Sequence, residues 1–381
     1  MTSFRAALLA ALCSIFLASC GDTFRPIAIP VPVNVPPGQA SKTAEVITGT
    51  AAGTVTNYNL SGATITGQAT TGQGPSAALL VGGLTYIANQ TDNTLSVVSA
   101  LAPQNSVPAT ITLDPGSLPA ALAIGVSPTV YVAYSGLDAV GIVTNNTVVG
   151  RILLPAGSTP AVMLSDTAGT KLFVGNVGSN NVSIIDLAAN TVVATVPCAH
   201  PSGMARTPDA PYVYVTCRDS NNVLILNANT KVADYDFSVG AAPVSATFDA
   251  NHKRLIVTSS GSNTVTFFEE NFSLPLANQH VQTIVTVGAA PVAAAPLPNG
   301  AKVYIANSGD GTVSVIDSGN LTVRSTISVG GQPAAIGAST DSTRVAVTTA
   351  APDVLQVIDA GTDQMNTSHP LPGPPKALII F

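Results

Sequence analysis

The chain has 381 residues, of which 46% are hydrophobic and only 9% are charged, and its formal net charge is −6 at pH 7. No cluster of Lys and Arg occurs, which argues against nucleic acid as a partner, because phosphate neutralisation needs clustered cations. Past the first 19 residues there is no run of 18 apolar residues, so the high apolar content does not indicate transmembrane helices.

Residues 1–19 have the pattern of a secretory signal peptide. Arg5 supplies the positive charge, and Ala6–Leu17 form an apolar stretch too short to span a bilayer as a mature helix. The stretch ends in Leu-Ala-Ser-Cys at Cys20, which resembles the lipobox of bacterial lipoproteins. That resemblance implies that Cys20 becomes the mature N-terminus and carries acyl chains as a membrane anchor. Plain secretion, with Cys20 unmodified, is the alternative.

Residues 20–45 form a segment rich in proline. Because proline fixes φ and lacks a donor, we expect an extended tether that could reach on the order of 75 Å at about 3.1 Å per residue. By resemblance to lipoprotein sorting, Gly21 after the lipidated cysteine favours the outer membrane. The sequence thus predicts a lipid-anchored protein of the bacterial cell envelope, facing the periplasm or the cell surface.

From Val46 onward the chain repeats one pattern eight times, roughly every 40 to 48 residues. Each copy has an aromatic or apolar anchor, a short polar turn and an alternating apolar strand. The clearest copies are Tyr304–Asp317, Phe173–Asp186 and Tyr214–Asn227, and weaker ones begin at Val46, Tyr86, Tyr131, Ile256 and Ala346. A period near forty built only of strands predicts a β-propeller.

The seventh repeat shows the four strands that we expect in each blade, named a to d from the central axis outward. They are Pro291–Pro296 (a), Lys302–Asn307 (b), Thr312–Asp317 (c) and Leu321–Val329 (d). Asp310-Gly311 between strands b and c is a strong hairpin signal. A proline starts each strand a, where no ladder donor is needed.

The two ends of the repeat region complement each other. The first repeat begins with strand b, whereas the last residues, Pro375–Phe381, have the pattern of a strand a with no b after it. Together they complete one blade, which would close the ring and remove its open sheet edge. The prediction is an all-β fold over residues 46–381: a propeller of eight four-stranded blades, closed by the C-terminal strand in the N-terminal blade. Seven blades are the alternative.

Two segments carry a family resemblance. Phe173–Pro197 and Tyr304–Pro333 resemble the YVTN-type β-propeller repeat, with its Tyr-Val-Thr-Asn strand, Gly-Asp-Gly-like turn and Val-Ser-Val-Ile-Asp strand. The resemblance implies blade geometry rather than chemistry, because the family includes surface-layer, periplasmic and lactonase-like members.

In a propeller, the b-to-c turns and the d-to-a links surround one mouth of the central channel. The residues that end strand b would line this rim, either capping the turns or forming a binding surface. They are Asn89, Tyr134, Asn176, Cys217, Ser259, Asn307 and Thr349.

One repeat departs from the others at this rim. Three residues before the proline of strand a most repeats have Gly, but this one has Cys198, followed by His200, and Cys217 takes the place of Asn307. Because strands a and b are antiparallel, both cysteines fall on the same rim. A disulfide, two free thiols and a Cys-Cys-His metal site are the open interpretations, although the metal site lacks a clear fourth ligand. Arg218 adjoins the pair as a further candidate for the binding face.

The sequence shows no nucleophile elbow, metalloprotease motif or phosphate-binding glycine loop. It favours a non-catalytic envelope scaffold without cofactor or metal, presenting its loops to a protein, glycan or small ligand. A lactonase-like hydrolase is one alternative, with Arg206, Arg218 and His200 as its rim candidates. A quinone-dependent dehydrogenase is disfavoured because the chain has no Trp. A laterally assembling surface-layer or adhesion component is the third class.

Overall fold

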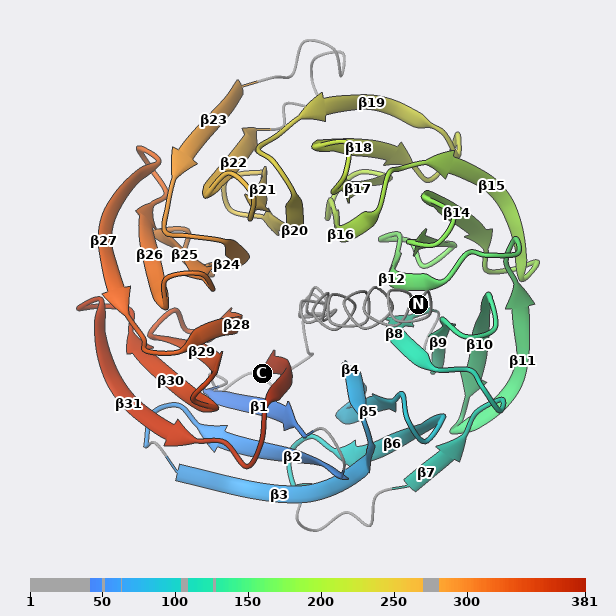
Figure 1. The fold of residues 1–381 in the computed structure, drawn as a ribbon, viewed down its shortest axis with the longest axis horizontal. Helices are drawn as coiled ribbons and strands as arrows, with labels where there is room; N and C mark the ends of the chain where they lie inside the picture. The colour runs from blue at the N-terminus through green and yellow to red at the C-terminus, as the bar shows by residue number, and fades with distance from the viewer. Residues whose placement is uncertain (1–41, 50–51, 63, 104–108, 126–127, 270–280) are drawn as a thin grey trace, which may run out of the picture.

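The computed structural model describes residues 42–49, 52–62, 64–103, 109–125, 128–269 and 281–381. The expected signal peptide, Cys20 and nearly all of the tether lie outside these residues. The described chain folds into eight four-stranded antiparallel sheets arranged radially around a central axis (Figure 1). This confirms the eight-bladed propeller. In the part of the chain that the structure describes, no helix is long and apolar enough to cross a membrane.

We number the blades along the chain, and within each the strands run from the axis outward as a, b, c and d. Blade 1 consists of β32 (Pro375–Ile380), β1 (Thr43–Thr48), β2 (Ala52–Asn59) and β3 (Thr64–Gln73). Blade 2 consists of β4 (Pro75–Val81), β5 (Leu84–Asn89), β6 (Thr94–Ser99) and β7 (Ala109–Thr112). Blade 3 consists of β8 (Pro119–Ile124), β9 (Thr129–Tyr134), β10 (Ala139–Thr144) and β11 (Thr147–Leu153). Blade 4 consists of β12 (Pro160–Ser165), β13 (Lys171–Asn176), β14 (Asn181–Asp186) and β15 (Thr191–Pro197).

The second half of the ring repeats the same order. Blade 5 consists of β16 (Pro201–Arg206), β17 (Tyr212–Cys217), β18 (Asn222–Asn227) and β19 (Ala233–Ser238). Blade 6 consists of β20 (Pro243–Asp249), β21 (Arg254–Ser259), β22 (Thr264–Glu269) and β23 (Val281–Thr286). Blade 7 consists of β24 (Pro291–Pro296), β25 (Lys302–Asn307), β26 (Thr312–Asp317) and β27 (Thr322–Ser328). Blade 8 consists of β28 (Gln332–Ala338), β29 (Arg344–Ala350), β30 (Val354–Asp359) and β31 (Gln364–Pro370).

The ring closes through the C-terminal strand. β32 pairs antiparallel with β1, with Ala44 opposite Ile380, and Thr43 and Phe381 exchange two backbone hydrogen bonds of 3.1 and 3.0 Å. The inner strands pack on one another in an unbroken circle, in which β32 contacts both β28 and β4. This confirms the composite blade expected from the two chain ends, and its strand b begins at Thr43.

Blade 7 shows why these residues form these strands. β25 is buried along its whole length, and β26 is buried except at its two ends. The outer strand β27 is mostly exposed and carries Thr, Arg and Ser. Strands b and c are therefore buried along most of their length because a neighbouring blade covers each of their faces, whereas the outer strand is largely exposed because it meets solvent.

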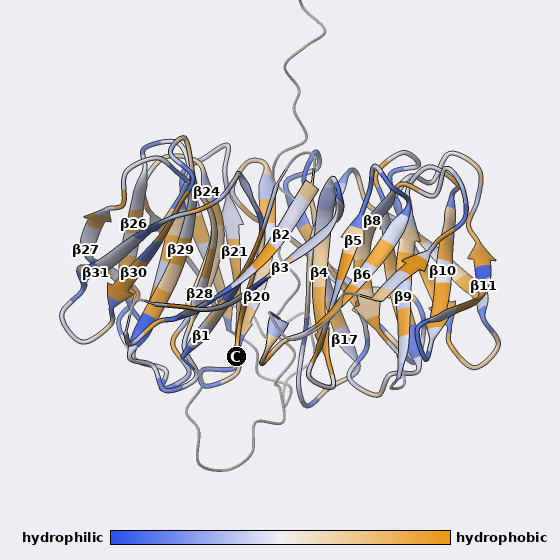
Figure 2. Ribbon diagram, turned by 90° about the horizontal axis from the view of Figure 1, so that it is seen from below, coloured by the Kyte–Doolittle hydropathy of each residue, from blue (hydrophilic) through white to orange (hydrophobic). Residues whose placement is uncertain are grey.

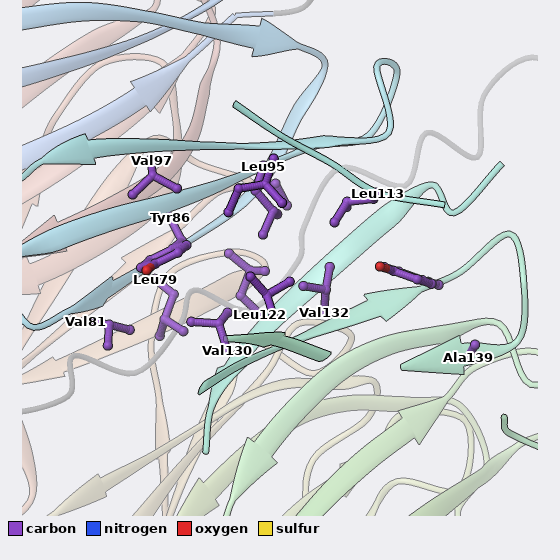
Figure 3. Close-up of a cluster of buried hydrophobic side chains, with 14 residues drawn as sticks. Leu79, Val81, Tyr86, Leu95, Val97, Leu113, Leu122, Val130, Val132 and Ala139 are labelled. Atoms are coloured by element: carbon purple, nitrogen blue, oxygen red, sulfur yellow. The ribbon is translucent and has the colours of Figure 1, made fainter. Parts of the chain in front are cut away.

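The core is divided among the contacts between neighbouring blades. Eight separate apolar clusters fill these contacts, one for each neighbouring pair. Figure 3 shows the cluster between blades 2 and 3, where Tyr86 and Leu95 of blade 2 pack toward Leu122 and Val132 of blade 3. Seen from the side, apolar residues concentrate in the strands and hydrophilic ones in the turns at the two faces of the disc (Figure 2). Stability is thus spread around the ring, and each blade depends on its neighbours.

Candidate functional site

The b-to-c turns and d-to-a links lie on one face of the disc, which we call the loop face. In blade 2 the turn residue Asn93 has a φ of 55°, and its Oδ1 accepts a 2.8 Å hydrogen bond from the backbone N–H of Leu118 in the following link. Asparagine tolerates this left-handed conformation better than most residues. The same bond recurs around the ring from His200 to Asn180, from Ala242 to Asn221 and from Ala290 to Asn263. In these four blades the b-to-c turn therefore holds the next link in place, and the two kinds of loop share a face as expected.

The asparagines that end strand b do not form a binding surface. Asn89, Asn176 and Asn307 are 0% exposed. Asn307 Nδ2 donates to Thr312 Oγ1 at 3.0 Å and to Ser314 Oγ at 2.9 Å, and Asn89 and Asn176 make the equivalent bonds in their blades. Because these amides lie beneath the turns and brace strand b against strand c, they cannot contact a ligand at the surface. The structure favours the capping interpretation for all three.

Ser259 and Tyr134 are equally buried at the corresponding positions. In blade 3 the ring of Tyr134 replaces the asparagine and lies over Gly141, where any Cβ would overlap it. Gly141 occupies the place of Ser314, so the larger residue on strand b is matched by a smaller one on strand c. Burial raises the pKa of Tyr134 to about 12, which leaves the phenol neutral. Tyr134 and Ser259 are therefore also parts of the blade interior rather than of a rim.

Blade 5 uses a disulfide at this position. Cys198 and Cys217 are bonded, with sulfurs 2.11 Å apart and Cα atoms 5.2 Å apart, and both are buried. In blade 7 the equivalent pair is Gly288 and Asn307, where a Cβ on the glycine would lie 2.5 Å from the amide nitrogen. The disulfide thus fills the space that glycine leaves for asparagine in other blades. In this form neither sulfur is a thiolate, so the bonded pair does not provide ligands for a Cys-Cys-His metal site.

A third substitution accompanies the disulfide. Leu224 stands at the position of Ser314 and packs in the apolar cluster that contains both cysteines. In blade 7 the Ser314 hydroxyl accepts a hydrogen bond from the Asn307 amide. Where a cysteine replaces the asparagine, a hydroxyl at this position would lack that donor. Three positions of this repeat therefore differ together from blade 7, so that an apolar brace replaces a polar one.

Of the predicted rim residues, His200 and Arg218 reach the surface. They lie together above the disulfide, since the Arg218 N–H donates to the His200 carbonyl at 3.0 Å. Asp219, which the sequence did not single out, lies 3.9 Å from His200 Nδ1. Arg206 does not join them, because it ends β16 at the opposite face, where it donates to the Ser165 carbonyl at 3.0 Å. The three rim candidates for hydrolysis are therefore split between two faces.

The loop face also contains a hollow that the sequence did not predict. It lies between blades 1 and 2 and has a volume of about 430 Å³. Its walls carry five hydroxyl groups and one carboxylate. The lining residues are Thr70, Thr71, Gly72, Asp92, Thr94, Ser96 and Thr110.

The buried floor of the hollow is oriented by hydrogen bonds. Ser96, which is 2% exposed, accepts a 3.1 Å bond from the Gly72 N–H and a 3.0 Å bond from Asn89 Nδ2. Because its oxygen accepts in both, its hydroxyl hydrogen is left to donate. Asp92 Oδ2 accepts the Gln73 N–H at 2.6 Å, so this carboxylate is held at the mouth. The hollow therefore offers both donors and acceptors to a ligand.

Part of this arrangement belongs to the repeat itself. Blade 7 has the same glycine, aspartate and serine at Gly288, Asp310 and Ser314, with a 3.3 Å bond from the Gly288 N–H to Ser314. The hollow differs in having Thr71 of β3 where the link from blade 6 to blade 7 has Val287, and in the short outer strand β7 of blade 2. The adjacent Thr70 and Thr71, together with the four-residue strand β7, are the sequence features that could have indicated the hollow.

Comparisons with known proteins agree with this architecture. Residues 198–369 match the model of the YNCE-like beta-propeller family. No curated protein matches the sequence. Among solved structures, the dihydro-heme d1 dehydrogenase NirN in complex with DHE is similar with a TM-score of 0.72 and 12% identity, covering 92% of this chain and 79% of that one.

Two other solved structures illustrate the range of similar proteins. AztD from Citrobacter koseri has a TM-score of 0.65 and 12% identity, covering 89% of this chain and 97% of its own. Virginiamycin B lyase from Staphylococcus aureus has a TM-score of 0.57 and 14% identity, covering 72% and 92%. Identities this low show a shared fold alone. The chain is therefore an eight-bladed β-propeller whose repeats fit the YVTN type, and its residues 198–369 match the YNCE-like beta-propeller family.

Proposed function

We propose that this propeller is a non-catalytic binding protein of the bacterial cell envelope, anchored through acyl chains on Cys20. The lipobox-like sequence and the proline-rich tether support the anchor. The loop face supports the binding role, because its exposed features are a polar hollow and the small His200, Arg218 and Asp219 group. The observation that carries the proposal is the hydroxyl-lined hollow between blades 1 and 2.

The chemistry of the hollow favours a small neutral ligand rich in hydroxyl groups, such as a sugar. Threonine and serine hydroxyls both donate and accept, which matches the hydroxyls of a pyranose. Its volume of about 430 Å³ is within the range of small-molecule sites, yet its lining is polar where most such sites are apolar. Asp92 is the single charged residue of the lining, so an ionic ligand would find little compensation.

Hydrolysis by the loop face gains no support from this geometry. His200 and Asp219 lie 3.9 Å apart, and Arg206 is on the opposite face. The hydroxyl of the neighbouring Ser202 is bonded to Thr216 at 2.8 Å and to the Pro243 carbonyl at 2.7 Å, away from any base. A panel of lactones and esters is expected to give no turnover, and robust hydrolysis would overturn the non-catalytic proposal.

Isosteric changes in the hollow are expected to weaken sugar binding. We expect D-glucose or N-acetylglucosamine to bind with the modest affinity of a shallow polar site, measurable by saturation-transfer NMR. Thr71→Val and Thr110→Val each remove one hydroxyl at constant volume, so each should weaken binding by roughly 2- to 10-fold. Valine is tolerated at the position of Thr71, since Val287 occupies the equivalent place in the link from blade 6 to blade 7.

Thr326→Val in blade 7 is the matched control. Thr326 pairs with Ser314 as Thr110 pairs with Ser96, but it is remote from the hollow. It should leave binding unchanged. If neither sugar binds, or if the Thr71→Val and Thr110→Val variants bind as well as the parent protein, the hollow is not the site.

A further inference from the structure

A buried glutamate lies in the strand on which the ring closes. Glu45 of β1 occupies the position of the aromatic anchor, which is Tyr86 in blade 2, Tyr214 in blade 5 and Tyr304 in blade 7. Its side chain is 0% exposed. Its backbone stands opposite Asn57 of β2 on one side and Ile379 of β32 on the other. A carboxyl group thus replaces an aromatic ring at the blade that joins the two ends of the chain.

The surroundings of Glu45 provide two polar groups. Neither carboxyl oxygen has a well-formed hydrogen bond. Asn57, its cross-strand neighbour, uses Nδ2 to donate to the Ala100 carbonyl of blade 2, which leaves the buried Asn57 Oδ1 without a donor. Thr85 of β5 in blade 2 lies beside the carboxyl and is buried with its hydroxyl unpartnered. Polar groups from two strands of blade 1 and one of blade 2 are therefore buried in this contact.

No described cation compensates a negative charge at this place. On β2 and β32, which pair with β1, and on β5, the titratable groups are Tyr58, Lys376 and Tyr86, and Lys42 precedes β1. On the blade 8 strands that pack on the other face of β1, Arg344 pairs with Asp359 at 2.6 Å. Lys42 pairs with Asp341 at 3.0 Å, and Lys376 is exposed on β32. Tyr86 donates to Asn146 at 2.8 Å, and the Tyr58 ring lies 5.6 Å from that of His369. The rest of this face is apolar, with Ile47 and Val55 packed against Leu80 and Ile87 of blade 2.

A neutral acid matches these partners, whereas a carboxylate does not. An ionised carboxylate only accepts, so it would face the unpaired oxygen of Asn57 without a donor between them. A protonated one can donate its hydrogen to Asn57 Oδ1 and accept from the Thr85 hydroxyl. Burying an unpaired charge would cost several kcal/mol, which a protonated side chain avoids.

We propose that Glu45 is held as a neutral acid whose proton bonds it to Asn57 of its own blade. The neutral pair ties the closing blade to blade 2, because Asn57 donates to the Ala100 carbonyl and Glu45 accepts from Thr85. Loss of the proton leaves a buried charge in the contact and loosens the seam between the two blades. The ring would then respond to alkaline conditions at one place, next to the strand pairing that closes it.

The direction of the pH dependence follows from burial. Burial raises the pKa of Glu45 from 4.5 to about 8, and Thr85 opposes this only in part. The unfolded chain therefore releases the proton near pH 4.5, while the folded chain keeps it up to about pH 8. In that window the folded state binds more protons at Glu45, so the contribution of Glu45 to stability falls as the pH rises from about 4.5 to about 8 and is constant outside that window.

Glu45→Gln tests the proposal, because glutamine keeps the shape and a donor but cannot ionise. We expect the melting temperature of the parent protein to fall roughly 5 °C further between pH 5 and pH 9 than that of the E45Q variant, by scanning calorimetry. Glu269→Gln, at an exposed glutamate on β22, is the matched control and should follow the parent protein. Parallel pH profiles for E45Q and the parent protein would overturn the proposal.

Hydrogen exchange of the parent protein gives a second measurement that needs no variant. After correction for intrinsic rates, β1, β32 and β5 are expected to lose protection between pH 6 and pH 9, while β17 across the ring keeps it. An equal loss of protection in all four strands would contradict a loosening confined to the contact between blades 1 and 2. This measurement remains available even if the E45Q variant fails to fold.

Discussion

Deletion of Lys376–Phe381 is expected to abolish the cooperative folding of the whole propeller. These residues form most of β32, and Leu378, Ile379, Ile380 and Phe381 are each less than 7% exposed. Burial of a large apolar side chain contributes roughly 1.5–3 kcal/mol, so their combined loss is comparable with the entire stability of a typical domain, about 5–15 kcal/mol. The truncation also leaves β1 as an unpaired inner edge. Calorimetry should show no cooperative transition, or one lowered by tens of degrees, and the protein should aggregate.

Lys376→Ala is the control for this deletion. Lys376 is the exposed residue of the same strand, so its replacement should leave the melting temperature within a degree or two of the parent protein. A truncated chain that melts like the parent protein would show that β32 is dispensable, and the ring would not depend on its closure.

Replacement of both Cys198 and Cys217 by Ala is expected to lower the free energy of unfolding by about 3 kcal/mol. The bond joins residues 19 apart in sequence, and in the chain-entropy model a loop of this size accounts for most of that loss. Denaturant unfolding measures the change. Alkylation under denaturing conditions, followed by mass analysis of the two peptides, should find both cysteines unmodified unless reductant is added. Two alkylated cysteines in the parent protein would contradict the disulfide.

A designed variant tests whether the hydrogen-bonded residues of blade 7 can replace the disulfide of blade 5. The triple variant C198G/C217N/L224S copies Gly288, Asn307 and Ser314 of blade 7 into blade 5. It is expected to recover about 1–2 kcal/mol of the loss, because it restores a buried amide with two acceptors. If it were no more stable than the double alanine variant, the two kinds of brace would not be interchangeable.

The sequence predicted the architecture because blade geometry is repeated and local. Each of Pro291–Pro296, Lys302–Asn307 and Thr312–Asp317 is observed with the expected bounds. The closure could be predicted because Pro375–Phe381 has the pattern of a strand a, and no strand b follows it in the sequence. Strand d was expected at Leu321–Val329 and is one residue shorter at each end, where alternation gives a weaker signal.

The rim was harder to predict, because position along a strand does not show which way a side chain points. Asn89 and Asn307 were placed correctly at the ends of their strands, yet both point into the blade. The clue was available in comparison between repeats: where Tyr134 replaces the asparagine, Gly141 replaces the serine, and where Cys217 replaces it, Leu224 does. Residues that change together across repeats are in contact, which marks them as interior.

The hollow and the environment of the buried glutamate could be identified only from the three-dimensional structure. Thr70 and Thr110 belong to different blades, and only the ring brings them together. Glu45 could have been noticed as an acid at an aromatic position, but the sequence does not show that Asn57 and Thr85 surround it.

Cysteines introduced at Ala44 and Ile380, in a Cys20→Ser background, test the closed ring most directly. The two residues are opposite each other in the register of β1 and β32, and the flanking pair Thr43–Phe381 exchanges both hydrogen bonds. Ala44 and Ile380 therefore form a non-hydrogen-bonded pair, whose Cα atoms lie about 4.5 Å apart, close enough for a disulfide. Mild oxidation of the folded protein should join the two ends within one chain in high yield, as a reducible band shift that neither single variant shows. Failure to cross-link, or cross-links only between chains, would contradict the ring.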